Sequence, residues 1–248
     1  MKRLTGLDDR SISSLIKDCP PLIEGKTRIV FNANEDSKTS NATSPSFLSL
    51  PIGCKSIMSD DPQFERHRNY LASRNFDPKE LEKTWKLYGT GPIGPYKFRI
   101  IAPIFYGGRM VSYQGRDITG KSKIKYKACS KSMELVNHKR ILYGLDFVND
   151  VAIIVEGIAD VWRLGKGAVA TFGIEFTQPQ VAILSKLRKC FIMFDAEEIA
   201  QKKAKELAES IVSLNPNVKV EIIKLSGVKD PAELTEKEAR EISSCLLE

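Results

Sequence analysis

The stretch VAIIVEGIADVWRLGKGAVATFGIEFTQPQVAILSKLRKCFIMFDAEEIA, residues 151–200, decides the fold of this chain of 248 residues. Its short apolar runs (VAIIV, AVATF and KCFIMF) alternate with segments of helical pattern. A long helix, expected over residues 198–214, then leads to a last apolar run, VKVEIIKL. Such alternation is typical of a doubly wound parallel sheet with helices on its faces. We therefore expect an α/β fold with a parallel sheet in the C-terminal part of the chain.

The sequence before this stretch follows a different pattern. Residues 61–88 predict two short helices, because the Asp-Pro pairs at Asp61 and Asp77 are helix-start signals. Residues 98–117 read as two strands around a Gly-Gly turn, which predicts a hairpin. A mixed α+β subdomain is therefore expected ahead of the parallel sheet.

Residues 32–46 are rich in Ser, Asn and Thr and poor in apolar residues, which predicts a polar linker. The chain is accordingly expected to have four parts: an N-terminal extension (1–60), a basic subdomain (61–148), the parallel-sheet domain (149–235) and a C-terminal helix (236–248).

The net charge of +7 is unevenly distributed. Residues 1–150 carry 25 Lys and Arg against 16 Asp and Glu, whereas residues 151–248 carry 13 against 15. Eleven basic residues between Lys97 and Arg140 face only two acidic ones, Asp117 and Glu134. Such a local positive field suits a polyanion, although charge alone does not distinguish a binding surface from a solvated basic face.

The composition argues against a membrane-spanning or secreted protein. No apolar stretch approaches the roughly 20 residues that cross a bilayer, and the start MKRLTGLDDR lacks the apolar run of a secretory signal. Five widely spaced cysteines fit neither a disulfide framework nor a zinc ribbon. The expected location is therefore the cytoplasm, with no membrane partner and no structural zinc.

Acidic residues follow the apolar runs. Glu156 comes directly after VAIIV, Asp195 and Glu197 follow KCFIMF, and Asp230 stands beyond VEIIKL. The carboxyl ends of parallel strands form one edge of a sheet, where ligands bind. Carboxylates gathered there repel one another unless a cation lies between them, and Mg²⁺ prefers oxygen ligands. The pattern favours a metal site, although each residue taken singly could equally cap a helix.

The motifs VEGIAD, ATFG, FDAE and KDPAEL, in this order, resemble the toprim domain of bacterial-type primases, topoisomerases and some nucleases. The preceding segment, with its GR turn, KY pair, late lysine and closing LYGL, is similar to the basic region of bacterial and phage primases. The resemblance covers about residues 61–235. It implies a toprim (Rossmann-like) parallel sheet flanked by helices and a primase: a nucleotidyltransferase with DNA-directed RNA polymerase activity in DNA replication.

The resemblance also implies roles for individual residues. Glu156, Asp195 and Asp230 would be catalytic, and with Asp160 and Glu197 they would bind Mg²⁺ or Mn²⁺. The ions would bridge a triphosphate and the attacking 3′-hydroxyl. Phosphates of the incoming nucleotide, or the template backbone, would be held by basic residues, for which the candidates are Arg116, Lys125, Lys127, Lys139 and Arg140.

The implied partners are single-stranded DNA, nucleoside triphosphates and a separate replicative helicase, in a bacterium or a phage-infected cell. The sequence departs from the primase pattern at three positions, because Ala196, Glu197 and Ala232 replace the usual Gly, Asp and Asp. Two alternatives therefore stay open: a non-catalytic, primase-like protein that binds single-stranded DNA, and a toprim nuclease.

Overall fold

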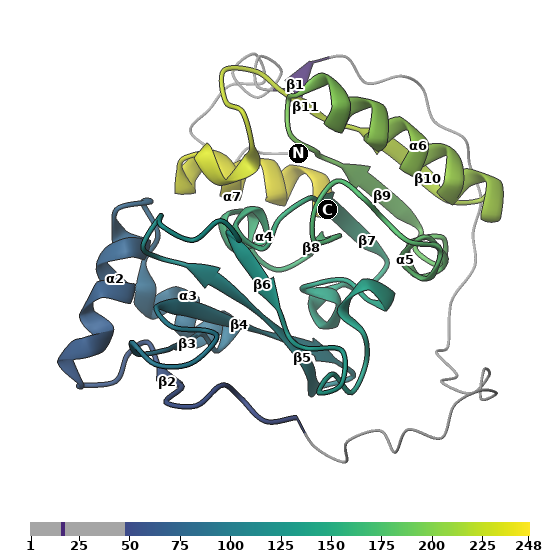
Figure 1. Cartoon of the computed structure of the whole chain (residues 1–248). Helices are drawn as coiled ribbons and strands as arrows, with labels where there is room; N and C mark the ends of the chain where they lie inside the picture. The colour runs from purple at the N-terminus through teal and green to yellow at the C-terminus, as the bar shows by residue number, and fades with distance from the viewer. Residues whose placement is uncertain (1–15, 18–47) are drawn as a thin grey trace.

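The computed structural model describes residues 16–17 and 48–248, which contain a parallel sheet, an antiparallel sheet and one short strand pair (Figure 1). The predicted linker near residues 32–46 lies outside the described residues. The α/β fold expected from the sequence is confirmed: a four-stranded parallel sheet follows a mixed subdomain along the chain.

The parallel sheet has the strand order β10-β9-β7-β8. Its strands are β7 (Val151–Val155), β8 (Ala168–Ala170), β9 (Lys189–Ile192) and β10 (Lys219–Ile222). Ile153 of β7 lies opposite Ala168 on one side and Phe191 on the other, so β7 is a central strand. All five β7 residues are buried, as expected for a strand covered on both faces.

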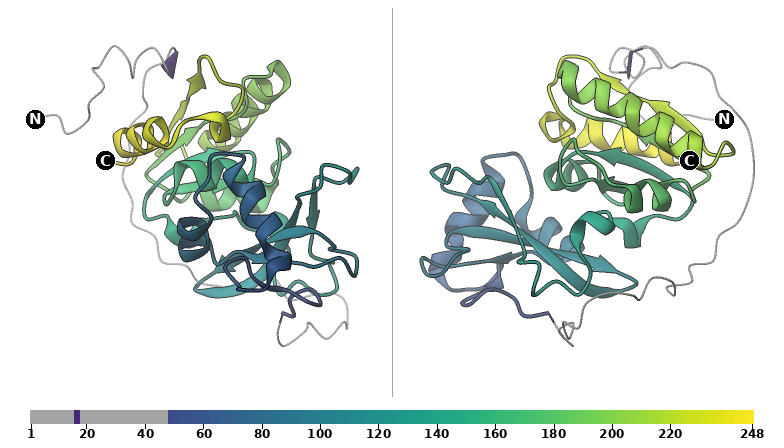
Figure 2. Two further views of the ribbon diagram at one scale, coloured as in Figure 1. Left: turned by 90° about the vertical axis from the view of Figure 1, so that its left-hand side faces the viewer. Right: turned by 45° about the vertical axis from the view of Figure 1, so that its right-hand side comes forward.

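Helices cover both faces of this sheet (Figures 1 and 2). The faces are separated by the alternation of side chains along β7. Ile153 packs in a cluster with Trp162 of α4 (Ile158–Leu164) and Ile242 of α7 (Glu236–Leu247). Ile154 packs in the opposite cluster with residues of α5 (Gln178–Leu184) and α6 (Glu198–Leu214). The C-terminal helix α7 is thus part of this layered core.

The last apolar run differs from the single strand that VKVEIIKL predicted. It divides at Ile223 into β10 and β11 (Lys224–Leu225). β10 stays parallel to β9 up to the pair Ile222 and Ile192, where β9 ends. β11 instead pairs antiparallel with β1 (Ile16–Lys17). Asp230 therefore does not follow a strand of the parallel sheet; it precedes the 3₁₀ turn η4 (Pro231–Glu233).

The antiparallel sheet has the strand order β2-β3-β4-β5-β6. Its long hairpin, β4 (Arg99–Tyr106) and β5 (Arg109–Asp117), turns at Gly107 and Gly108, as the sequence predicted. The shorter strands are β2 (Lys55–Ser56), β3 (Tyr88–Gly89) and β6 (Tyr126–Ala128). Both glycines have positive φ angles, which a tight turn of this kind requires.

Two short helices precede the hairpin, as predicted. The 3₁₀ turn η1 (Pro62–Phe64) leads into α2 (Glu65–Ala72), and α3 (Pro78–Trp85) follows. The Asp77 side chain accepts a hydrogen bond from the amide of Lys79 at 2.8 Å, so it caps α3 at its N-terminus. Two further 3₁₀ turns, η2 (His138–Arg140) and η3 (Leu145–Phe147), connect the hairpin region to β7.

Aromatic residues pack the two subdomains against each other. The Phe76 and Trp162 rings meet edge to face at 6.1 Å across the predicted boundary, and on its N-terminal side the Trp85 and Tyr143 rings stack at 5.4 Å. The Trp162 indole N–H donates to the Tyr143 hydroxyl at 2.9 Å. One buried cluster therefore runs across the predicted boundary at residues 148/149, and the division into domains stays a prediction.

Among the described residues, no helix combines the length and the apolar composition needed to cross a membrane.

Candidate active site

A cavity of about 240 Å³ lies where the carboxyl edge of the parallel sheet meets strands β5 and β6. We call it the inter-sheet pocket. It is lined by acidic residues on the parallel-sheet side and by basic residues on the other. Its lining consists of Arg74, Gln114, Arg116, Lys125, Tyr126, Glu156, Gly157, Ile158, Ala159, Asp160, Phe172, Gly173, Asp195, Asp230 and Ala232.

Four carboxylates form the acidic wall of this pocket. Glu156 follows β7 directly, and its Oε1 accepts a hydrogen bond from the amide of Asp195 at 3.0 Å. Asp160 lies in the first turn of α4 and accepts from the amide of Gly157 at 2.8 Å. Asp230 accepts from the amide of Glu233 at 3.1 Å. Hydrogen bonds to backbone amides thus hold these acidic segments in place without a bound ligand.

Gly157 explains part of the VEGIAD motif. A Cβ at this position would lie 3.0 Å from Oδ2 of Asp160, closer than real Cβ atoms normally approach a neighbour. Glycine therefore allows the Asp160 carboxylate to fold back onto the backbone at the start of α4.

Crowding shifts the acids toward their protonated forms. Burial, with the neighbouring Asp195, raises the pKa of Glu156 to about 7. Burial, with the charges of Asp195 and Asp230, raises the pKa of Asp160 to about 8. Burial and the charge of Asp230 raise the pKa of Asp195 to about 6. A cation between them would relieve this repulsion.

The donor atoms suit a hard divalent ion. Oδ1 of Asp195 is buried and has no hydrogen-bond partner, so it is an oxygen that a ligand would satisfy. In the described part of the chain, no three Asp, Glu, His or Cys side chains are close enough to enclose an ion. Mg²⁺ usually takes one or two carboxylates and completes its shell with water and substrate phosphates. The acidic wall fits an ion shared with a ligand better than an ion enclosed by protein.

The basic wall comes from β5, β6 and the turn after α2. Gln114 and Arg116 lie two residues apart on β5, so they share the face toward the parallel sheet. Lys125 precedes β6, and burial together with the charges of Arg116 and Arg74 lowers its pKa. In the described residues, no ion pair joins Lys125 to the acidic wall. The cations thus line the pocket without being neutralised by its acids.

Lys139 lies near the pocket, but its ammonium already donates hydrogen bonds to the protein backbone. Its ammonium donates to the backbone carbonyl oxygens of Thr171, Phe172 and Glu175 at 3.1, 3.2 and 2.8 Å. Phe172, which lines the pocket, has a φ angle of 63°, a conformation that is costly for a bulky residue. Lys139 therefore holds the loop after β8 in place, whereas the resemblance implied a direct contact with phosphate.

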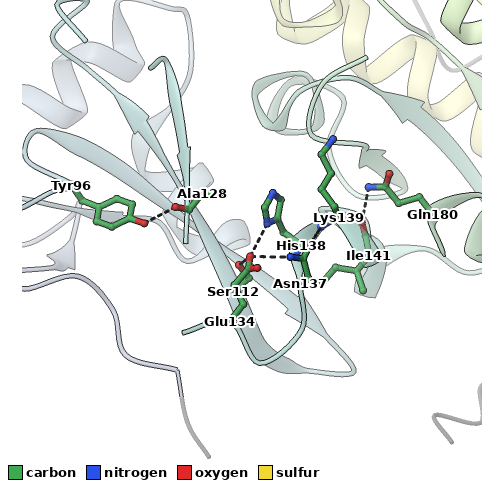
Figure 3. Close-up of polar contacts among 9 residues, drawn as sticks. All are labelled: Tyr96, Ser112, Ala128, Glu134, Asn137, His138, Lys139, Ile141 and Gln180. Carbon is green, nitrogen blue, oxygen red and sulfur yellow. Dashed lines mark hydrogen bonds and ion pairs between the residues drawn. The ribbon is translucent and has the colours of Figure 1, made fainter. Parts of the chain in front are cut away.

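A buried polar network anchors the segment before Lys139 (Figure 3). The carboxylate of Glu134 accepts a hydrogen bond from the Ser112 hydroxyl at 2.6 Å and lies 2.7 Å from Nδ1 of His138. Burial alone would raise the pKa of Glu134, but the hydrogen bonds from His138 and Ser112 lower it overall. On the other side, Gln180 donates to the Ile141 carbonyl oxygen at 2.9 Å.

The remaining predicted residues do not line this pocket. Glu197 is exposed at the start of α6, and Arg140 is exposed at the end of η2. Lys127 lines a second cavity, of about 670 Å³, on the opposite face of the antiparallel sheet. We call it the outer basic pocket. It is lined by Arg66, Gly94, Pro95, Lys97, Phe98, Arg99, Asp117, Thr119, Lys121, Ser122, Ile124 and Lys127.

Sequence reasoning missed Arg74 and Gln114. Arg74 reaches the pocket because the buried guanidinium of Arg163 in α4 donates to the carbonyl oxygens of Arg74 and Asn75, at 2.9 and 3.0 Å. The same guanidinium donates to the Ala232 carbonyl oxygen at 3.3 Å. No local sequence motif indicates these hydrogen bonds from Arg163. Gln114 had a signal, since it shares the β5 face with Arg116.

Comparisons with known proteins agree with this architecture. Residues 153–235 match a protein family described as toprim-like. No curated protein sequence matches the chain. The solved structures that are similar in fold include three primases. The Aquifex aeolicus primase, with zinc-binding and RNA polymerase domains, aligns with a TM-score of 0.62 at 23% identity, over 75% of this chain and 56% of that chain.

The second is a DnaG primase catalytic domain bound to single-stranded DNA, with a TM-score of 0.65 at 19% identity, over 77% of this chain and 73% of that chain. The third is the primase fragment of the bacteriophage T7 primase-helicase protein, with a TM-score of 0.54 at 18% identity, over 72% of this chain and 73% of that chain. Residues 153–235 are therefore a toprim-like domain, and the chain has the fold of bacterial and phage primase catalytic cores.

Proposed function

We propose that this chain is a primase: a nucleotidyltransferase that makes short RNA primers on single-stranded DNA with Mg²⁺ or Mn²⁺. The observation that carries the proposal is the inter-sheet pocket, which places four carboxylates opposite Arg74, Arg116 and Lys125. A nucleoside triphosphate needs both walls, because its phosphates are anionic and polymerisation requires metal. The toprim-like match and the primase-core fold support the same activity.

In this proposal the two walls have different tasks. Asp195 and Glu156 hold metal ions, with Asp160 and Asp230 completing the negative field around them. Bound ions would neutralise the triphosphate and lower the pKa of the attacking 3′-hydroxyl. Arg116 can bind a phosphate with two parallel hydrogen bonds, and Lys125 supplies a compact charge beside it. The buried position of Arg116 keeps its charge in a medium of low dielectric, where it acts more strongly than in water.

The outer basic pocket is the proposed site for part of the DNA strand. Its cations Lys97 and Lys121 form no ion pair with an acid in the described residues. The pocket's acidic residue, Asp117, is occupied by the amides of Thr119 and Gly120. Phe98 offers a partly exposed aromatic ring on which the Arg66 guanidinium lies at 4.6 Å. Cations beside an aromatic ring are typical of surfaces that bind single strands.

The proposed setting is DNA replication in the cytoplasm of a bacterium or a phage-infected cell. The T7 relative is a fragment of a primase-helicase protein. By analogy with this relative, we propose a replicative helicase as partner.

One observation favours a second function, binding of single-stranded DNA without synthesis. Ala232 stands where the primase pattern has an acid. Its carbonyl oxygen accepts a hydrogen bond from Arg163, and its side chain adds no metal ligand to the acidic wall. A protein of this kind would bind DNA in the outer basic pocket and make no product.

A primer-synthesis assay separates the two functions. The full chain is incubated with a set of single-stranded templates, labelled nucleoside triphosphates and Mg²⁺ or Mn²⁺. The proposal predicts short labelled products that depend on template, metal and nucleotide. The matched control is Asp150→Asn, because Asp150 is an exposed acid paired with Arg188 far from the pocket.

Absence of products on every template, with DNA binding intact, would favour the binding function. Cleavage of the labelled template without nucleotide would instead indicate a nuclease.

A further inference from the structure

The guanidinium of Arg116 is held by two tyrosines. Its Nε donates a hydrogen bond to the Tyr70 hydroxyl at 2.8 Å. Its Cζ lies 4.7 Å from the centre of the Tyr126 ring and 5.8 Å from that of Tyr70. Arg116 itself is only 7% exposed. A long, flexible side chain is therefore fixed in one plane and one orientation.

This arrangement decides which of its hydrogen-bond donors remain for a ligand. A guanidinium has five N–H groups in a planar fork. Nε is used by Tyr70, and the Tyr126 hydroxyl also interacts with the guanidinium. Neither terminal nitrogen is among the described polar atoms that are buried without a partner. The two terminal NH₂ groups are thus the part of Arg116 that a phosphate in the inter-sheet pocket would meet, in the bidentate geometry that arginine favours.

Tyr70 is well placed to fix this geometry. It belongs to α2, a helix anchored by the fully buried Leu71, and its ring packs against the main core cluster. Tyr70 and Arg74 are four residues apart. Their side chains therefore lie on the same side of the chain at the C-terminal end of α2. Arg74 lines the pocket, and Tyr70 binds the back of Arg116.

We infer that Tyr70 is a positioning residue: its hydroxyl locks the Arg116 guanidinium so that its terminal NH₂ groups face the triphosphate. The inference rests on the proposed function for the identity of the ligand. Tyr70 itself touches no substrate and acts only through Arg116. Without the hydroxyl, Arg116 keeps its charge and its stacking on Tyr126 but gains freedom to rotate.

The test is Tyr70→Phe in the full chain, which keeps the ring and removes the hydroxyl. Primer synthesis should show a KM for nucleoside triphosphate raised about fivefold, the size expected for the loss of one ordinary hydrogen bond, with kcat changed less than about twofold. In an Arg116→Ala background, Tyr70→Phe should have no further effect, because the group it positions is gone. Tyr88→Phe is the matched control, since Tyr88 is a half-buried tyrosine of β3 away from the pocket.

A second readout needs no activity. In ¹⁵N-edited NMR spectra, the Nε–H signal of Arg116, assigned by its loss in Arg116→Lys, should be protected from exchange in the unmodified protein. It should lose that protection in Tyr70→Phe and keep it in Tyr88→Phe. Equal protection in Tyr70→Phe, an unchanged KM, or the same fivefold effect in the Arg116→Ala background would overturn the inference. If the signal responds as expected but no primers are made, the proposed function fails and the positioning of Arg116 stands.

Discussion

The two walls of the inter-sheet pocket are built in different ways. The acidic wall comes from short segments that follow β7, start α4, follow β9 and start η4, all within the toprim-like domain. The basic wall is assembled from α2, β5 and the approach to β6, which meet only through tertiary packing. The sequence pattern predicted the acidic wall from local positions, whereas Arg74 of the basic wall, which packing alone brings to the pocket, left no local signal.

The largest expected effect tests the acidic wall. Asp195→Asn keeps the size of the side chain and removes the charge of the carboxylate whose Oδ1 has no partner. Primer synthesis should fall about 10²–10³-fold, the usual cost of losing one group that stabilises charge in a transition state. Binding of single-stranded DNA should change little, because the outer basic pocket is untouched. Primer yield and fluorescence anisotropy measure the two properties, and equal losses in both would contradict separate sites for synthesis and for DNA binding.

The next effect tests the basic wall. Arg116→Ala should raise the KM for nucleoside triphosphate about 30-fold, or about 2 kcal/mol, because a bidentate, partly buried phosphate contact is lost. Steady-state primer synthesis measures it. Arg188→Ala serves as the control, since Arg188 forms an exposed pair with Asp150 and lies outside the pocket. Similar KM values in both variants would remove Arg116 from the proposed phosphate site.

A third prediction concerns Arg163, which hydrogen-bonds to the backbone of both walls. The Arg163 guanidinium donates hydrogen bonds to the backbone carbonyl oxygens of both Arg74 and Ala232. A lysine has no planar group of N–H donors that could bind both oxygens in this way. Arg163→Lys should lower the free energy of unfolding by about 2 kcal/mol, measured by urea denaturation. Arg240→Lys is the control, because Arg240 forms only an exposed pair within α7. Equal stability of the two variants would mean that Arg163 does not join the walls.

The smallest effect follows from the crowded acids. Their pKa values in the folded protein, about 7, 8 and 6 for Glu156, Asp160 and Asp195, lie above the ordinary value of about 4. The folded protein therefore binds more protons than the unfolded chain between about pH 4 and pH 8, and its stability falls as the pH rises through this range.

Thermal unfolding of the metal-free protein should thus show a melting temperature a few degrees lower at pH 8 than at pH 6. Mn²⁺ should raise the melting temperature more at pH 8, because metal and protons compete for the same oxygens. Asp160→Asn should reduce the pH dependence. A melting temperature that rises with pH in the metal-free protein would contradict the repulsion between these acids.

The sequence predicted most of the fold. Asp-Pro start signals located α2 and α3, the Gly107-Gly108 turn located the hairpin, and apolar runs located β7 to β9. The division of VKVEIIKL at Ile223 was not predictable, because it depends on where the neighbouring strand β9 ends. Local patterns carry information about elements but not about their partners.

The candidate site was predicted less evenly. Glu156, Asp160, Asp195 and Asp230 meet at one pocket. Glu156 and Asp195 follow neighbouring strands of the parallel sheet, whereas Asp230 arrives from the turn η4 after the chain has left that sheet. Glu197 was a candidate because it follows the run KCFIMF and stands where the family pattern has an acid, yet the chain turns into α6 there and leaves it exposed. Lys139 was a candidate from the resemblance, but the loop carbonyl oxygens around its ammonium became visible only in three dimensions. The roles of all these residues stay predictions.

The central claim is that the acidic wall binds divalent metal together with a nucleotide. Crystals of the full chain soaked with Mn²⁺ and a nucleoside triphosphate, measured at the manganese absorption edge, test it most directly. We expect an anomalous peak in the inter-sheet pocket within bonding distance of Asp195, with the phosphates lying between the peak and Arg116. Bound nucleotide without a peak there, or a peak only elsewhere on the protein, would contradict it.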